Sequence, residues 1–332
     1  MAELDRVSRR ILQELSSDAR IPINRLAKNL GKSRSVVFSR LRFMENEFGL
    51  RYTLELDMQK LGLSSYLIKA KLRKPVDRAL LHEFIKNDPT AQFIAVTKGE
   101  FDLLICAVAK SQLQYIRWEY SMRSSLKDYL VWWKASPVVF ERVGFFPLND
   151  GLIRSLELPE IQKNLLASLN EDARTPFNEL AKKLGVTLAA LRYHFKVLLK
   201  AGLIKRFTAV MQKPPMPFHI VYFTTFTYAK GYEERCKEMR KLSTRESQEQ
   251  PCNTYSLAYE LSGGSDMFVW ASFNDLKEGY ARVEEEDKIF ELDEIRHETA
   301  LALEVIHGLW PIRNVEIKKL YDASSWEEIK EQ

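Results

Sequence analysis

The chain has 332 residues, a formal net charge of +5, 45% hydrophobic residues and 29% charged residues. This is an ordinary globular composition that excludes a largely disordered or fibrous chain, and the length predicts two or more domains. No apolar run reaches membrane-spanning length and no apolar signal stretch stands near the start, so we expect neither a membrane partner nor secretion. Three scattered cysteines, Cys106, Cys236 and Cys252, share no metal-binding spacing, which indicates a cytoplasmic compartment, no metal and no cofactor.

A repeated segment organises the chain. Residues 18–31 read DARIPINRLAKNLG and residues 172–185 read DARTPFNELAKKLG, with ten of the 14 positions identical at a constant offset of 154. About one identity would be expected by chance from average residue usage. Two copies are too few for a solenoid, so the repeat predicts a tandem duplication that folds as a pseudo-dimer.

Each copy opens with three short helical patterns. In copy one, apolar residues at helical spacing over residues 7–15 predict the first helix, and Pro22 suits the first turn of the second. Gly31 ends that helix where a left-handed residue is favoured, and Ser33 suits the N-cap of a third helix. A short turn containing glycine between two helices is typical of a helix-turn-helix. Copy two repeats the pattern around Gly185, which predicts a second module of the same kind.

Charge favours nucleic acid as the partner of both modules. Residues 1–51 carry 11 Lys and Arg against 6 Asp and Glu, and residues 158–206 carry 9 against 4. Three-helix modules also serve as protein-interaction units, but basic modules of this kind favour double-stranded DNA. Arginines on the outward face of the third helix suit phosphate contact and guanine recognition in the major groove. The expected DNA-binding residues are Lys32, Ser33, Arg34, Ser35, Ser39, Arg40 and Arg42 in copy one and Arg192, Tyr193 and Lys196 in copy two, where the face is poorer in charge.

The remaining two thirds of each copy follow a strand-helix-strand-strand-helix-strand order, which is typical of a ferredoxin-like module. Segments 50–56 and 203–210 precede it and suit a wing or a linker strand. Copy one predicts strands at 66–72, 91–97, 101–108 and 129–140, with helices at 76–87 and 111–126. Copy two predicts strands at 218–228, 253–261, 267–273 and 295–306, with helices at about 231–242 and 275–288.

The predicted fold class is therefore α+β, with two winged helix-turn-helix modules alternating with two ferredoxin-like effector modules. The expected helix-turn-helix modules are residues 1–57 and 151–210. The expected effector modules are residues 58–150 and 211–312, followed by a C-terminal tail at 313–332.

A glycine turn joins the two middle strands of each predicted effector module. The turns read TKGEFD at 97–102 and SGGSD at 262–266. Tight hairpins account for both, because glycine supplies positive φ and aspartate satisfies turn amides. The alternative is a small-ligand loop in which backbone amides and the aspartate meet an amino acid. The candidate effector-binding residues are Thr97, Gly99, Asp102, Ser262, Gly263 and Asp266.

The order of modules resembles the Lrp/AsnC family, the leucine-responsive and asparagine-related regulators. The residues that carry the resemblance are Leu4-Asp5, Ile11-Leu12, Asp18-Ala19-Arg20, Leu26-Ala27, Leu30-Gly31 and the G-x-x-D turns at Gly99–Asp102 and Gly263–Asp266. The resemblance implies a nucleoid-associated transcription regulator that is not an enzyme. It also implies dimers through the effector modules and, in some members, an amino-acid effector. This chain departs from the family in its two copies, its low-charge second recognition helix and its tail.

Two other functions fit the same architecture. Sirohaem decarboxylases resemble it, sometimes as fused pairs, and the resemblance implies histidine and arginine around the second and third strands of the effector module. Here those stretches, FIAVTKGEFDLLICA and TYSLAYELSGGSDMFVWA, contain neither residue. A chromatin-like protein that coats DNA with little sequence preference is the other alternative.

Opposite charges predict how the effector modules pair. Residues 66–145 carry 13 Lys and Arg against 8 Asp and Glu, whereas residues 218–312 carry 10 against 18. Two acidic modules repel one another, while a basic and an acidic module attract. We therefore expect copy one to pair with copy two. The short tether at 151–157 favours an assembly of two chains, a homo-oligomer through the effector modules, over pairing within one chain.

Overall fold

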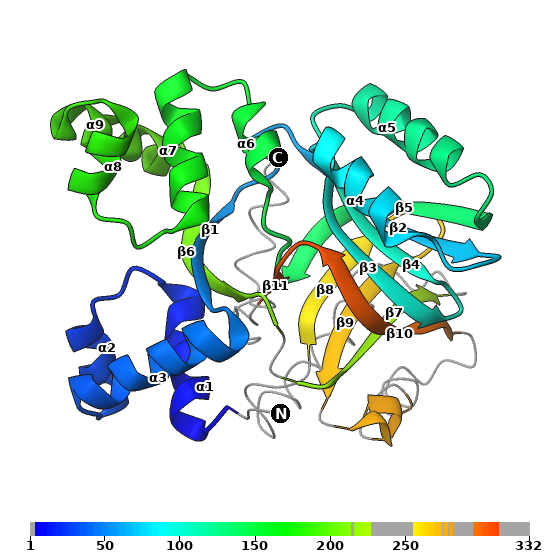
Figure 1. The fold of residues 1–332 in the computed structure, drawn as a ribbon, viewed down its shortest axis with the longest axis horizontal. Coiled ribbons are helices and arrows are strands. Elements are labelled where there is room, and N and C mark those ends of the chain that lie inside the picture. Colours follow the sequence, from blue (N-terminus) through cyan, green and yellow to red (C-terminus); the bar gives the residue numbers. More distant parts are fainter. Residues whose placement is uncertain are drawn as a thin grey trace.

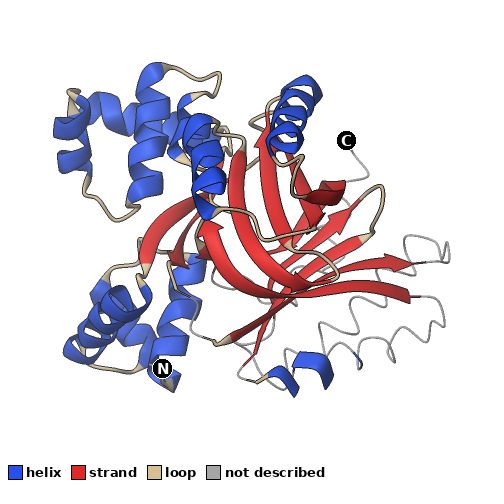
Figure 2. Cartoon of the chain, turned by 45° about the vertical axis from the view of Figure 1, so that its right-hand side comes forward, coloured by secondary structure: helices blue, strands red, loops and turns tan. Residues whose placement is uncertain are grey.

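The computed structural model describes residues 4–213, 216–226, 255–273, 275–277, 279–281, 284 and 295–311. Two helical modules lie on one side of the molecule, a β-barrel lies on the other, and a short sheet lies between the modules (Figure 1). Turned by 45°, the molecule shows the long curved barrel strands and the separate helical modules (Figure 2).

The first helical module contains α1 (Arg6–Ser17), α2 (Ile23–Leu30) and α3 (Arg34–Phe48). Each boundary has a local cause. The Asp5 carboxylate accepts a hydrogen bond from the Ser8 amide at 2.7 Å and caps α1. Gly31 adopts φ 61° after α2, as expected for a left-handed C-cap. Pro22 is the N-cap of α2, one residue earlier than its expected place in the first turn.

The second helical module contains α7 (Glu160–Glu171), α8 (Phe177–Leu184) and α9 (Leu188–Lys200). Gly185 repeats the left-handed C-cap with φ 66°, and the Thr187 side chain caps α9 by accepting from the Ala190 amide. A short helix, α6 (Asp150–Arg154), precedes the module. The sequence reading did not predict α6, whose five residues are too few to show periodicity.

A three-stranded sheet joins the modules. It consists of β1 (Arg51–Leu56), β6 (Ile204–Met211) and the two-residue β11 (Trp310–Pro311), in the order β1-β6-β11. Strands β1 and β6 run antiparallel with Arg51 opposite Val210 and Thr53 opposite Thr208. The segments predicted as wings or linker strands are therefore linker strands, and they pair with each other.

The copy-one elements follow the predicted order. They are β2 (Ser64–Leu72), α4 (Arg78–Asn87), β3 (Ala91–Gly99), β4 (Leu103–Ala109), α5 (Gln112–Ser125) and β5 (Leu130–Val143). Each differs from its predicted range by at most three residues at either end. Helices α4 and α5 cover the outer face of this part of the barrel, where Trp118 and Met122 of α5 are buried (Figure 1).

Copy two contributes β7 (Phe218–Phe226), β8 (Tyr255–Leu261), β9 (Met267–Phe273) and β10 (Ile295–His307). Its predicted helix at 231–242 lies outside the described residues. The predicted helix at 275–288 is described only in part, and residues 276–277, 279–281 and 284 are helical there.

The strands of both copies form one closed barrel in the order β10-β3-β4-β2-β5-β8-β9-β7. Two seams join the copies: β3 pairs with β10, and β5 pairs with β8. The expected pair of separate ferredoxin-like sheets is thus replaced by a single shared barrel, because the edge strands of each copy find partners in the other. The pairing occurs within one chain, so the preference for two chains was wrong. Through α6, α7 and β6 the chain brings copy two beside copy one despite the short tether.

One continuous core runs from the helical modules into the barrel, where Phe93, Tyr259, Phe268 and Trp270 are buried. The ring of Phe93 lies edge-on to Trp270 with centroids 5.4 Å apart. In the described part of the chain, no helix combines the length and apolarity that crossing a membrane requires.

Candidate nucleic-acid interface

The outward face of α3 presents most of the residues expected to contact DNA. Lys32, Arg34, Ser35 and Ser39 are exposed. The Arg42 side chain is 65% exposed, and its guanidinium lies 5.3 Å from the centroid of the exposed Phe38 ring. The Arg42 guanidinium also lies 3.4 Å from the Glu45 carboxylate, and its exposure leaves its other donors accessible to phosphate or base edges.

Two further expected residues also have partners within their own module. The Ser33 hydroxyl accepts a hydrogen bond from the Val36 amide and caps α3. The Arg40 guanidinium forms a 2.8 Å ion pair with Asp5, the residue that caps α1. The Ser33 contact caps α3 and the Arg40 contact connects α3 to α1, so both residues hold the recognition helix in place.

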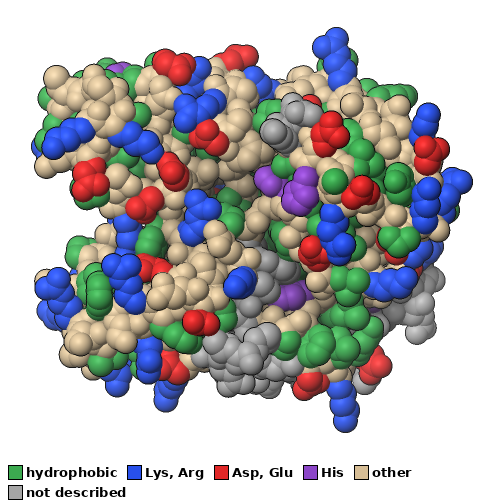
Figure 3. Space-filling model, viewed as in Figure 1, with side chains coloured by type: hydrophobic (Ala, Val, Ile, Leu, Met, Phe, Trp, Pro, Cys, Tyr) green, Lys and Arg blue, Asp and Glu red, His purple; other side chains and the backbone are tan. Residues whose placement is uncertain are grey.

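The outward face of α9 is different. Arg192, Tyr193 and Lys196 are exposed, with Tyr193 at 63%. The ring of Tyr193 lies edge-on to that of His194, with centroids 5.2 Å apart. Lys and Arg side chains of both modules line the side of the molecule opposite the barrel (Figure 3).

Main-chain hydrogen bonds hold the two helical modules against the linker sheet in a reciprocal manner. The Ala19 amide, which follows α1, donates to the Phe207 carbonyl of β6 at 2.9 Å. The Ala173 amide, which follows α7, donates to the Tyr52 carbonyl of β1 at 2.9 Å. Each module is thereby attached to the linker strand of the other copy.

The arginines of the repeated Asp-Ala-Arg segment complete this attachment. Arg20 donates to the Ala173 carbonyl at 2.6 Å, and Arg174 donates to the Ala19 carbonyl at 2.6 Å. The Arg174 guanidinium also lies 4.0 Å from the centroid of the Tyr52 ring. We call these two reciprocal arginines the clamp. Sequence reading found the repeat but missed this role, because the two segments meet only in the folded chain.

The copy-one glycine turn lies at the β3–β10 seam. The Asp102 carboxylate accepts hydrogen bonds from the Leu72 amide at 2.9 Å and from Lys71 Nζ at 3.2 Å. The Thr97 hydroxyl is buried and donates to the Phe101 carbonyl at 2.9 Å. A Cβ on Gly99 would lie 2.5 Å from a carbonyl oxygen of β10, so the position requires glycine.

The copy-two turn occupies the equivalent place at the β5–β8 seam. The Asp266 carboxylate accepts from the Phe226 amide of β7 at 2.9 Å, as Asp102 does from the Leu72 amide of β2. The Ser262 amide donates to the Pro137 carbonyl at 3.0 Å, and Gly263 adopts φ 93°. In both turns the aspartate fastens the turn to a neighbouring strand, so the hairpin explanation accounts for its presence.

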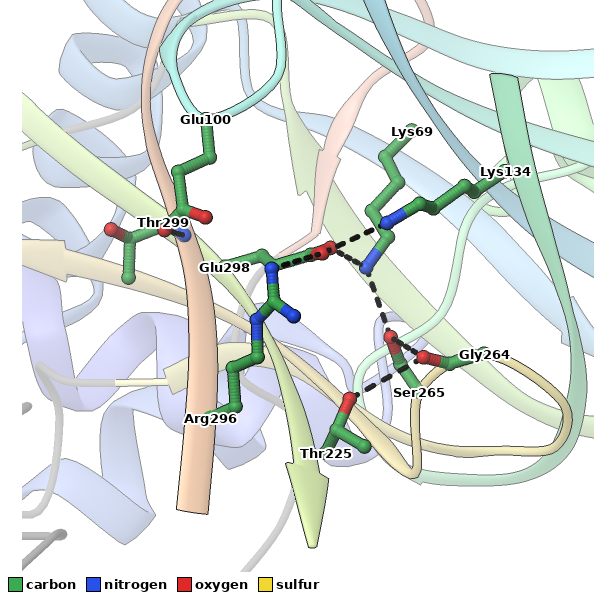
Figure 4. Close-up of polar contacts among 9 residues, drawn as sticks. All are labelled: Lys69, Glu100, Lys134, Thr225, Gly264, Ser265, Arg296, Glu298 and Thr299. Carbon is green, nitrogen blue, oxygen red and sulfur yellow. Dashed lines mark hydrogen bonds and ion pairs between the residues drawn. The ribbon is translucent and has the colours of Figure 1, made fainter. Parts of the chain in front are cut away.

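A buried ion cluster lies across the barrel between the copies (Figure 4). Lys69 of β2 is 2% exposed and contacts the Glu298 carboxylate of β10 and the Ser265 hydroxyl, the latter at 2.9 Å. Lys134 of β5 reaches the other Glu298 oxygen at 3.1 Å. Lys69 Nζ also lies 4.5 Å from the centroid of the Phe223 ring.

Burial lowers the pKa of Lys69, and the two lysines lower the pKa of Glu298 against the opposing effect of its burial. Both lysines come from copy one and the carboxylate from copy two, in keeping with the charge difference between the modules, and Arg296 of copy two lies 3.7 Å from the same carboxylate (Figure 4). The one signal in the sequence was a lysine inside the apolar strand YLIKAKL. In the part of the chain that is described, no group of three or more His, Cys, Asp or Glu is arranged to hold a metal ion.

Comparison with known proteins agrees with this organisation. A family model for winged helix-turn-helix DNA-binding modules matches residues 4–47 and again residues 158–205. The HTH-type transcriptional regulator LrpA of Pyrococcus horikoshii is 37% identical over 67 residues, which are 20% of this chain and 48%, about half, of that protein. The proline dehydrogenase transcriptional activator of Rhodobacter capsulatus is 34% identical over 107 residues, which are 31% of this chain and 69% of that protein.

One solved structure is similar along nearly the whole chain. The sirohaem decarboxylase NirDL aligns with a TM-score of 0.59 over 96% of this chain and 99% of its own, at 16% identity. At that identity the likeness concerns the fold alone. The two matched helix-turn-helix regions, together with the regulator that is 34% identical over two thirds of its length, show that this chain belongs to the Lrp/AsnC family and carries the family's unit twice.

Proposed function

We propose that the protein is a DNA-binding transcription regulator whose two helix-turn-helix modules both contact double-stranded DNA. The observation that carries the proposal is the pair of exposed recognition faces on α3 and α9, set in modules that match a winged helix-turn-helix family. The basic charge of both modules complements the phosphate backbone. The cytoplasmic, nucleoid-associated location expected from the sequence accompanies this function.

Arg34 and Arg42 provide the direct test. Replacing either with alanine should weaken DNA binding by about 1–3 kcal/mol if the side chain reads a base, and by less if it contacts phosphate. The measurement is a gel shift of the full chain on DNA fragments from its own genome. Arg117→Ala is the matched control, because Arg117 is exposed on α5, away from the helical modules. Unchanged affinity in both variants would refute the assignment of α3.

Salt provides a second test. Binding that depends on phosphate neutralisation weakens steeply with ionic strength, with a slope of about 0.9 per phosphate contacted. Lys32→Ala should reduce that slope by about one unit if Lys32 contacts phosphate. Footprints on unrelated sequences then separate a sequence-specific regulator from the chromatin-like alternative, which would protect all of them equally.

An enzyme of the sirohaem decarboxylase type is the second candidate, and the whole-chain likeness in fold is the observation that favours it. Against it, strands β3, β4, β8 and β9 contain no histidine and no arginine. We propose that the protein is not such an enzyme. Mixing the protein with sirohaem should leave the absorption spectrum of sirohaem unchanged, and a shifted spectrum followed by release of carbon dioxide would establish the alternative.

We propose that a small amino-acid-like effector, if the protein has one, binds near the two glycine turns. The turns lie at the seams between copies, where a ligand would touch both halves. Their aspartates are already bonded to neighbouring strands, so backbone amides would supply much of the recognition. Calorimetric titration with the twenty amino acids tests this, and the absence of heat with all of them would leave the turns as structural hairpins.

We also propose self-association through the outer faces of the effector modules, since the barrel closes within one chain. Leu113, Ile116 and Tyr120 form an exposed apolar stripe on α5, with Tyr120 at 68%. Sedimentation should show an oligomer that Leu113→Glu dissociates. A monomer at micromolar concentration in the unmodified protein would refute this proposal.

A further inference from the structure

The two recognition helices occupy equivalent positions but carry different side chains. Ser33 and Thr187 are equivalent at the repeat offset of 154, and each caps its helix through its hydroxyl. Val37 and Leu191 are likewise equivalent, and both are buried against their own module. Because caps and core agree, outward positions can be compared one to one.

The first turns of the two helices differ in chemistry. Arg34 and Ser35 are exposed on α3, whereas the equivalent residues of α9 are Leu188 and Ala189. In helix-turn-helix proteins, the N-terminal residues of the recognition helix contact base edges in the major groove. Arginine suits O6 and N7 of guanine, whereas small or apolar side chains suit the C5 methyl group of thymine.

In the second turn the charged side chain lies on α9 and not on α3. Phe38 of α3 is equivalent to Arg192 of α9, and Ser39 is equivalent to Tyr193. The positive charge therefore begins in the first turn of α3 but only in the second turn of α9. A shift of charge along the helix axis changes which base or phosphate the side chain can reach, so the two faces do not read the same sequence.

The fold holds the two recognition faces in a fixed position relative to each other. Antiparallel β1 and β6 relate the modules by an approximate two-fold arrangement, and the clamp bonds attach each module to the other copy. Both modules lie on the same side of the molecule (Figure 1). One chain therefore presents two unlike recognition faces, in a constant arrangement, on the same side of the molecule (Figure 1).

We infer that the protein recognises a non-palindromic DNA site made of two different half-sites. The half-site under α3 presents guanine to Arg34. The half-site under α9 presents thymine methyl groups to Leu188 and Ala189. This inference rests on the proposed function, and it concerns which duplex the two modules bind rather than whether they bind DNA.

The experiment selects duplexes from a random library with the full chain and measures affinity for the selected duplex by fluorescence anisotropy. The expected result is two unlike half-sites about one helical turn apart, centre to centre. Replacing the guanine with 7-deazaguanine, which lacks N7, should weaken binding of the unmodified protein about 2-fold to 10-fold, because it removes one of the two acceptors of a bidentate contact. The same change should have little effect on the Arg34→Ala variant.

The other half-site has its own probe. Replacing thymine with uracil removes only the methyl group and should weaken binding of the unmodified protein several-fold, and that of the Leu188→Ala variant less. A third variant tests whether the first turn of α9 determines which half-site it binds. L188R/A189S gives α9 the first-turn chemistry of α3 and should bind tightest to a duplex in which the α3 half-site occurs twice, as an inverted repeat. Thermal unfolding confirms that each variant is folded.

Three outcomes would overturn the inference. A selected site that is a perfect palindrome contradicts unlike half-sites directly. Equal affinity for all duplexes contradicts it while leaving DNA binding intact. Failure to bind any duplex at low salt refutes the proposed function as well, so the two failures are distinguishable.

Discussion

Lys69 shows how unlike side chains at equivalent positions of the two copies fit together. Its equivalent at the repeat offset of 154 is Phe223, and the two side chains lie against each other as cation and ring. Across the strand pairs, Lys69 is opposite Lys134, and Phe223 is opposite Glu298. A symmetric pair of copy-one modules would bring lysines together here, so the two unlike copies complement each other.

The loss of stability should depend on which member of this cluster is replaced. Glu298→Gln leaves Lys69 buried with neutral acceptors only, the new amide oxygen and the Ser265 hydroxyl, whereas Lys69→Met leaves Glu298 with Lys134 and Arg296. We expect Glu298→Gln to lower the free energy of unfolding by about 3–5 kcal/mol, and Lys69→Met by clearly less. Urea unfolding measures both. The double variant should be more stable than Glu298→Gln alone, and a result in the reverse order would contradict this account.

Glu141 should make the stability depend on pH. Its carboxyl lies between the linker sheet and the barrel, where burial raises its pKa to about 7 and the nearby Glu55 and Asp57 add to the effect, against Lys205 at 3.9 Å. In the unfolded chain the carboxyl ionises near 4.5. Between these values the unfolded state binds fewer protons, so the contribution of this group to stability falls as pH rises from about 4.5 to 7.

The Glu141→Gln variant tests this directly. It should match the unmodified protein near pH 4.5 and exceed it at pH 8 by about 3 kcal/mol, the free energy of a pKa difference of this size. Glu83→Gln on the exposed face of α4 is the control and should change neither value. Equal unfolding midpoints for Glu141→Gln and the unmodified protein at pH 8 would mean that the folded protein accommodates the charged carboxylate without cost.

At the scale of elements, the clamp joins the corners after α1 and α7 to the opposite copy. Replacing Arg20 or Arg174 with alanine removes a charged hydrogen bond to a carbonyl and should lower the free energy of unfolding by about 1–3 kcal/mol in each case.

Loss of the clamp should also weaken binding to a duplex with two half-sites more than to one with a single half-site. Calorimetric unfolding and anisotropy measure these effects, with Arg25→Ala on the exposed face of α2 as control. Equal weakening on both duplexes would show that the clamp does not set the arrangement.

Elements whose causes are local could be predicted from the sequence. Ser33, Gly31 and Gly185 mark helix boundaries by capping and φ preferences, and the structure places all three as expected. The copy-one strands were also predicted closely, because apolar runs between turns carry a local signal. For the interface, the exposed positions of Arg34 and Arg42 followed from helical periodicity, but the pairing of Arg40 with Asp5 did not.

What the sequence did not reveal depends on contacts between distant segments. The seams β3–β10 and β5–β8 join residues about 200 and 120 positions apart, and nothing within either strand specifies its partner. The same holds for the clamp and for the contact of Lys69 with Glu298, which lie 153 to 229 residues apart in sequence. Only the bulk charge of the copies indicated their pairing, and it did not indicate a closed barrel.

At the scale of the whole molecule, the barrel should hold the halves together without the covalent link. A protease site inserted after Glu157, in the exposed segment between α6 and α7, allows the folded chain to be cut. The cut halves should still elute together in gel filtration, because the β3–β10 and β5–β8 seams and a continuous core join them. In urea the halves should separate more readily when the salt concentration is high, because salt screens the attraction between the basic copy and the acidic copy. Elution as separate halves without denaturant would contradict this expectation.

The closed barrel has a consequence for how such a regulator responds to its own abundance. In the described strands, each barrel strand has a neighbour on both sides, so no edge remains for an exchanging subunit. A regulator assembled from separate subunits falls apart when diluted and can trade halves with related proteins in the same cell. Here the two recognition faces stay in one-to-one proportion at every concentration. Filling both half-sites of one site should therefore need no encounter between two chains, even at a few copies per cell, and no relative should be able to replace one half.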